Sequence, residues 1–166
     1  MANIKRIFRH LALADGQVKR AFSNPTLGAI EQAIVASELK HSGELRFVVE
    51  GGLSGAPLYA GESARERAID VFSQLRMWDT DGRNGVLIYL LMADHAVEIV
   101  ADRGVNAQVG SAEWERICHA METAFHDGRY EAGVIEGISA INDHLLRHFP
   151  ANGANHDELP NKVVVL

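Results

Sequence analysis

The segment GVLIYLLMADHAVEIVA, residues 85–101, predicts the centre of the fold. Residues 86–92 form a nearly unbroken apolar run of strand length, which is typical of a strand buried on both faces. After Asp94 and His95, the residues up to Ala101 alternate in the pattern of a second strand. Because only a short turn separates the two runs, we expect a tight hairpin with an antiparallel partner strand.

Helical and strand patterns flank this hairpin. Residues 44–50 have the pattern of another strand, and a glycine-rich loop follows them. Apolar residues at helical spacing predict core helices over residues 24–41, over residues 62–76, from Ser111 onward and over residues 130–148. This order of helices and strands predicts an α/β fold, in which one small mixed sheet has helices on both faces.

The two ends of the chain differ from this central part. Residues 1–23 form a basic amphipathic helix and a connector, residues 24–149 form the domain, and residues 150–166 form a tail. The tail ends in three valines and a leucine. Because this end is too apolar to remain in solvent, we expect it to dock on the same chain or on a neighbouring copy.

Composition excludes several classes of protein. The chain has 166 residues and a net charge of −6, and its 16 lysines and arginines are too few for the basic surface that duplex nucleic acid requires. The single cysteine, Cys118, excludes an intrachain disulfide. No apolar run has the length of a bilayer-spanning helix, and the first residues lack the apolar block of an export signal. We therefore expect a cytoplasmic protein without a nucleic-acid partner.

Residues 3–13 have the pattern of a short basic amphipathic helix. Lys5, Arg6 and Arg9 lie away from the apolar face, to which Phe8 belongs. Such a helix can lie on an anionic membrane surface, so these four residues are candidates for peripheral contact with the inner face of a membrane. Packing on its own domain or on a partner subunit is the alternative and the commoner use of such helices.

The most polar loop precedes the predicted central strand. Asp79 and Asp81 lie two residues apart and Asn84 follows, so the loop could offer hard oxygen ligands to calcium or magnesium. The spacing does not match that of an EF-hand, because Leu90 occupies the position of its bidentate glutamate. The alternative is a solvated turn whose acidic side chains cap its own backbone.

A second polar cluster follows the hairpin. Asp102 would complete a cation site if this segment and the Asp79–Asn84 loop converge, and the Arg103 guanidinium could contact a phosphate or a carboxylate. A structural pair between Asp102 and Arg103 is the alternative. Glu50, at the end of the first strand, is a third acidic candidate for ligand contact, with an exposed strand terminus as the alternative.

Five segments occur in an order that one family shares. They are the strand at 44–50, the helix that ends at Trp78, the sequence NGVL at 84–87, the strand and glycine turn at 97–104, and the pattern of Phe125, Asp127, Gly128, Tyr130 and Gly133. Over residues 24–148 the chain therefore resembles the TPM domain family, which includes plant thylakoid-lumen proteins linked to photosystem repair and many bacterial envelope proteins. The resemblance implies a three-layer α/β/α sandwich, a calcium or other divalent cation held by loops at one edge of the sheet and, for some plant members, acid phosphatase activity.

Two positions depart from the family's pattern. Arg83 stands where the family has an aspartate, and residues 102–106 replace its Gly-Tyr-Gly-Leu-Glu turn. A cation site would therefore depend on Asp79, Asp81 and Asp102. Three functions follow as hypotheses. The first is a non-enzymatic accessory domain that binds a divalent cation or a protein partner near a membrane, the second is a metal-assisted phosphatase, and the third is an assembly domain that forms homo-oligomers.

Overall fold

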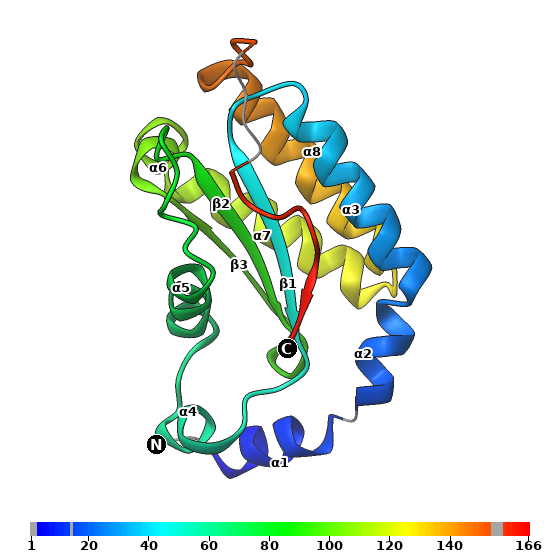
Figure 1. Ribbon diagram of the computed structural model, residues 1–166. Helices are drawn as coiled ribbons and strands as arrows, with labels where there is room; N and C mark the ends of the chain where they lie inside the picture. Colours follow the sequence, from blue (N-terminus) through cyan, green and yellow to red (C-terminus); the bar gives the residue numbers. More distant parts are fainter. Residues whose placement is uncertain (1–2, 14, 154–157) are drawn as a thin grey trace.

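The computed structural model describes residues 3–13, 15–153 and 158–166 and has three layers (Figure 1). A four-stranded mixed sheet in the order β3-β2-β1-β4 forms the middle layer. The strands are β1 (Glu44–Glu50), β2 (Gly85–Leu91), β3 (Ala96–Ala101) and β4 (Val164–Val165). β1 runs parallel to β2 and to β4, whereas β2 and β3 form the antiparallel hairpin that the sequence predicts. The α/β fold with a small mixed sheet is confirmed.

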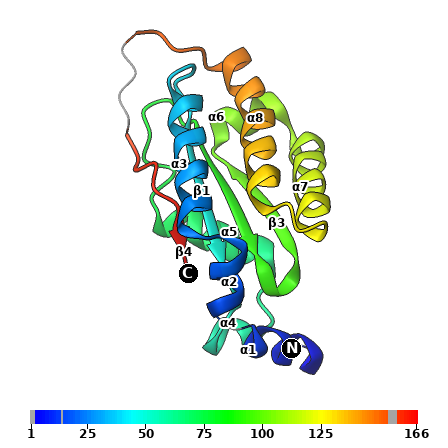
Figure 2. The same cartoon turned by 90° about the vertical axis from the view of Figure 1, so that its right-hand side faces the viewer.

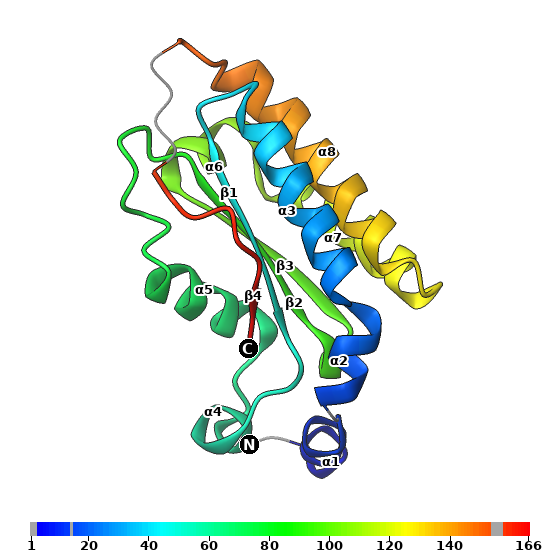
Figure 3. The same cartoon turned by 45° about the vertical axis from the view of Figure 1, so that its right-hand side comes forward.

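Helices cover both faces of this sheet (Figure 3). α3, α7 and α8 form one layer, in which α8 packs against both of the others (Figure 2), and α5 covers the opposite face. The helices are α1 (Ile4–Ala12), α2 (Asp15–Ala21), α3 (Asn24–Glu38), α4 (Gly55–Ala60), α5 (Ala64–Gln74), α6 (Arg103–Val109), α7 (Ser111–His126) and α8 (Tyr130–His148), with a 3-10 turn at Met92–Asp94.

Alternation along β1 divides the core in two. Phe47 and Val49 pack with the α3, α7 and α8 layer, while Val48 packs on the opposite face against residues of α5. This division follows from the pleat, because successive side chains of a strand point to opposite faces. All seven residues of β2 are buried, so β2 is the central strand that its apolar run predicts.

Three short helices were not predicted. α2, α4 and α6 occupy segments for which the sequence indicates connectors or polar loops. Each has only six or seven residues, too few to show a helical period. Some longer helices have clear start signals, as at α5, where Ser63 and Glu66 form a capping box, whereas α7 and α8 begin without a side-chain cap.

The tail docks on the same chain. Val163 is buried, and Val164 and Val165 pair with Val48 and Val49 of β1 as an added parallel edge strand. The Leu166 N–H also donates to the Val49 carbonyl at 2.9 Å. The sequence left two docking partners open, the same chain or a neighbouring copy, and the structure shows the first.

Within the described ranges, no helix combines the length and the apolar character needed to cross a bilayer. α8, the longest helix, has 19 residues, but its exposed side carries several charged side chains.

Candidate functional site

The two polar segments meet at the end of the sheet where β1 and β2 begin. β1 and β2 start side by side, with Glu44 opposite Gly85, and β3 ends there because it runs antiparallel to β2. The Asp102 N–H donates to the Gly85 carbonyl at 2.8 Å, and the Gly104 N–H donates to the Arg83 carbonyl at 3.0 Å. We call this region, residues 80–85 and 102–104, the amino-end rim.

Glycine at position 104 allows the close approach of the two segments. A Cβ at this position would lie 2.6 Å from the Arg83 carbonyl oxygen and 3.0 Å from that of Gly82. Neither is a flexible side-chain end, so a larger residue would push α6 away from the loop. The glycine that the sequence places after Asp102 and Arg103 therefore has a packing role in the rim.

Asn84 is buried in the rim, with only 2% of its surface exposed. Its amide nitrogen donates to the Ser42 carbonyl at 2.6 Å, and its backbone N–H donates to the Thr80 hydroxyl at 3.2 Å. Its Oδ1 is buried and has no hydrogen-bond partner among the described residues. Asn84 thus ties the loop to the start of β1 and retains one free acceptor.

Asp102 caps the first turn of α6. Its Oδ1 accepts the Arg103 N–H at 2.7 Å, whereas Oδ2 is buried and, within the ranges described, accepts no hydrogen bond. The contact with Arg103 therefore involves its backbone, and the Arg103 side chain is exposed beside the rim. A carboxylate oxygen that is shielded from water and unpaired is costly, because folding removes its hydration without replacement.

Asp79 and Asp81 do not join Asp102. The Asp79 carboxylate is about half exposed and forms an ion pair with Arg76 at 2.9 Å. Asp81 is exposed, and its backbone N–H donates to Glu158 of the tail at 3.2 Å. Across the part of the chain that the structure describes, no three acidic, histidine or cysteine side chains form a group that could hold a metal ion. A cation at the rim would therefore have one carboxylate ligand, supplemented by the Asn84 amide.

Glu50 lies at the opposite end of β1 from the rim. Its carboxylate accepts two hydrogen bonds from Arg67, at 2.9 and 3.1 Å, and one from the Tyr89 hydroxyl at 2.7 Å. These bonds raise the pKa of Arg67, and burial together with the bond to Glu50 raises the pKa of Tyr89. Glu50 is 7% exposed, so the alternative of an exposed strand terminus is wrong. Its carboxylate lies at the end of β1 opposite Arg103 and is already paired with Arg67.

Arg6, Arg9 and His10 of α1 are turned toward the domain. The Asp94 carboxylate accepts hydrogen bonds from Arg6 at 2.7 Å and from Arg9, and contacts His10 Nε2 at 3.0 Å. Burial raises the pKa of Asp94, but the bonds from Arg6, His10 and Arg9 outweigh burial and lower it to about 2. Sequence reasoning missed this ion cluster because Arg6 and Asp94 are 88 positions apart, and neither position carries a local signal.

The opposite, apolar side of α1 faces solvent. Ile4 and Phe8 are each 68% exposed and Leu11 is 58% exposed, while Lys5 is exposed beside them. The helix does pack on its own domain, as one of the two sequence alternatives has it, through Arg6, His10 and the partly buried Ile7. Because the rest of its apolar side is exposed, the usual orientation of an amphipathic surface helix is largely reversed.

The family model described as TPM domain matches residues 18–144, which is more than half of the chain. The chain belongs to the TPM domain family. No curated protein matches this TPM domain.

Two solved structures are similar to this domain. The NMR structure of BA42 from the psychrophilic bacterium Bizionia argentinensis is 32% identical, with a TM-score of 0.74, and the match covers 87% of this chain and 94% of that one. The N-terminal domain of a P. gingivalis protein is 20% identical, with a TM-score of 0.60 over 78% of this chain and 82% of that one, and supports the fold alone.

Proposed function

We propose that this TPM domain is a non-enzymatic binding module whose amino-end rim holds a divalent cation, calcium or magnesium. The observation that carries the proposal is the presence of two buried side-chain oxygens, Asn84 Oδ1 and Asp102 Oδ2, that accept no hydrogen bond within the described residues. Buried polar atoms are normally paired, and hard cations select carboxylate and amide oxygens.

The rim supplies part of the oxygen ligand set that such an ion needs. Asp102 and Asn84 would hold it, and the ion would neutralise the buried Asp102 carboxylate and polarise any group bound beside it. With one carboxylate in the set, we expect weak binding, because calcium affinity rises with the charge of the ligands. The exposed Arg103 guanidinium lies next to the rim and would contact a carboxylate or a phosphate of a protein partner.

Thermal melting in EDTA, in calcium and in magnesium tests the rim. At a hundredfold excess over the dissociation constant, binding should stabilise the native state by about 2.7 kcal/mol. For a chain of this size, this corresponds to a rise in Tm of about 5–10 °C. Asp102→Asn should remove the rise, whereas the matched variant Asp79→Asn, which changes an exposed carboxylate paired with Arg76, should retain it.

Two results would contradict the proposal. One is an unchanged Tm of the natural protein in both cations, or an equal rise in Asp102→Asn. The other is hydrolysis of para-nitrophenyl phosphate that requires the cation and is lost in Asp102→Asn, which would make the protein the phosphatase that the family resemblance offers as the alternative.

Contact with an anionic membrane is a second candidate function, favoured by the reversed orientation of α1. Ile4, Phe8 and Leu11 are exposed on one side of this helix, and Lys5 lies beside them. Apolar side chains would enter the headgroup boundary while the lysine meets anionic lipid. Because Arg6 and Arg9 are bound to Asp94, the apolar residues should contribute more than charge, and added salt should weaken binding only in part.

Flotation with vesicles of phosphatidylglycerol and phosphatidylcholine tests this candidate. The natural protein should float, and Phe8→Asp should not. Leu39→Asp is the matched control, because Leu39 is 78% exposed at the end of α3, away from α1. Equal flotation of the two variants, or a natural protein that stays in the soluble fraction, would exclude membrane contact through α1. Point variants are preferable to removal of residues 1–20, because Val18 belongs to the core.

A further inference from the structure

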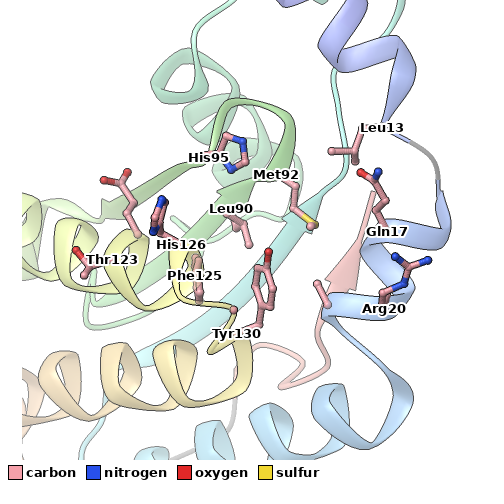
Figure 4. Close-up of a pocket in the computed structure, with 13 residues that line it drawn as sticks. Leu13, Gln17, Arg20, Leu90, Met92, His95, Thr123, Phe125, His126 and Tyr130 are labelled. Carbon is pink, nitrogen blue, oxygen red and sulfur yellow. The ribbon is translucent and has the colours of Figure 1, made fainter.

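A large cavity lies at the end of the sheet opposite the amino-end rim. Its volume is about 930 Å³, within the range of small-molecule sites, which is about 300–1,000 Å³. Three parts of the chain enclose it, namely the α1–α2 segment, the β2–β3 hairpin and the turn between α7 and α8 (Figure 4). This end carries the carboxyl ends of the parallel strands β1 and β2, where α/β folds commonly bind ligands.

The inner part of the cavity is apolar. Leu90 of β2 and Phe125 of α7 are both nearly buried beneath it, and the partly buried Leu13, Met92 and Tyr130 surround them. Figure 4 shows Met92 and Tyr130 on one side of the space and Leu13 across from them. The Tyr130 ring is held in place by stacking on Phe125, with ring centroids 5.5 Å apart. Such a lining would accept an alkyl chain or an aryl ring.

The mouth of the cavity carries polar side chains that the fold does not use. Among the described residues, no hydrogen bond or ion pair engages the side chains of Gln17, Arg20 or His95, or the Tyr130 hydroxyl, all of which line the cavity. Glu122, the carboxylate of the lining, already accepts the Val97 N–H at 2.9 Å and contacts His119 at 3.0 Å. Among the described side chains of the lining, the permanent charge left without a partner is therefore that of Arg20.

We propose that this cavity binds a small amphipathic carboxylate, with its apolar body against Leu90 and Phe125 and its carboxylate at Arg20. A guanidinium pairs with a carboxylate through two parallel hydrogen bonds, and the Tyr130 hydroxyl offers a further donor. Arg6 and Arg9 are paired with Asp94, so the positive charge of this wall comes from Arg20 and its neighbour Lys19 on α2. The site is separate from the amino-end rim and does not depend on a cation there.

Titration with dodecanoate below its micelle concentration tests the proposal, followed by amide chemical shifts in NMR spectra. We expect saturable binding, with shifts at Leu13, Gly128 and Tyr130. Arg20→Gln should weaken binding about tenfold, the effect of losing one charge-assisted contact. Lys19→Gln is the matched control, because Lys19 is the neighbouring exposed cation on α2 and does not line the cavity. Dodecyltrimethylammonium, with the same chain and opposite charge, should bind more weakly than dodecanoate.

Each other result would overturn the proposal. No binding of dodecanoate would exclude the site, and equal weakening by Arg20→Gln and Lys19→Gln would indicate a general charge effect. Equal binding of both detergent ions would show that the cavity does not select an anion. Shifts confined to residues 4–11 would place dodecanoate on the apolar side of α1. Shifts at Asn84 and Asp102 would place it at the rim, so this experiment also separates the cavity from the proposed cation site.

Discussion

Three carboxylates, Glu50 and Asp94 at one end of the sheet and Asp102 at the other, differ in how fully they are hydrogen-bonded. At the end where β1 and β2 finish, Glu50 is paired with Arg67 and Tyr89, and Asp94 is paired with Arg6, Arg9 and His10. At the end where they start, Asp102 keeps one buried oxygen without a hydrogen-bond partner in the described ranges. Figure 1 shows this separation, with α1 at one end and α6 at the other. A carboxylate whose oxygens all accept hydrogen bonds stabilises the fold, whereas one with an unpaired oxygen is available to a ligand.

The largest effect should come from Glu50→Ala. This change leaves the Arg67 guanidinium and the buried Tyr89 hydroxyl without their acceptor, and loss of one partner from a buried pair costs about 3 kcal/mol or more in the free energy of unfolding. Urea unfolding measures the loss. Glu136→Ala is the control, because this 65% exposed carboxylate pairs with Arg129 at the surface and should lose less than about 1 kcal/mol. Equal losses would mean that burial does not distinguish the two pairs.

A second effect concerns His41, which lies fully buried near the amino-end rim. Its Nδ1 accepts the Gly43 N–H and its Nε2 bonds to the Ser37 hydroxyl, and burial lowers its pKa from 6.5 to about 4. Because the unfolded chain takes up a proton below pH 6.5 and the folded chain does so only near pH 4, stability falls as pH decreases through this window. The loss should be about 3 kcal/mol.

Urea unfolding between pH 7 and pH 4 measures this dependence. His41→Gln should flatten the profile, whereas His126→Gln, at a 91% exposed position, should leave it unchanged. A profile that keeps its slope in His41→Gln would assign the loss to other groups.

The Asp94 carboxylate, at the opposite end of the sheet, should affect stability at lower pH than His41 does. Its pKa is lowered from 3.8 to about 2, so it stabilises the fold above pH 4 by about 2 kcal/mol, and this contribution disappears as pH falls toward 2. Asp94→Asn should be less stable at pH 7 by this amount and should approach the natural protein at the lowest pH. Hydrogen exchange should become faster in α1, which Asp94 holds in place; unchanged exchange there would contradict this assignment.

The smallest effect should be that of Asp102→Asn in EDTA. An asparagine retains the oxygen that caps α6, and it removes a charge whose Oδ2 has no hydrogen-bond partner in the described residues, so stability should change by less than about 1 kcal/mol. Asp102→Ala is the comparison, since loss of the cap should cost about 1 kcal/mol. Thermal melts of both variants measure these differences. A loss in Asp102→Asn as large as that in Asp94→Asn would show that the two carboxylates do not differ.

The candidate site could be predicted in part, where its signals are local. The polar segments that contain Asn84 and Asp102 flank the hairpin in the sequence, and the antiparallel register brings these segments together. Asp79 and Asp81 look equivalent to Asp102 in sequence, but they are exposed, and only the fold shows this difference. The cavity could not be predicted either, because its lining comes from three distant parts of the chain.

The sequence by itself determined the strands β1 to β3, the five longer helices and the family, because strand alternation over six or seven residues, helical periodicity over nine or more and the residues of turns are local properties. Tertiary structure decided which charges are satisfied. Arg6 reaches Asp94 across 88 positions, and the apolar side of α1 is consequently left in solvent. The pairing of a charge depends on distances in space, and a periodic pattern identifies the polar side of a helix without showing what that side will contact.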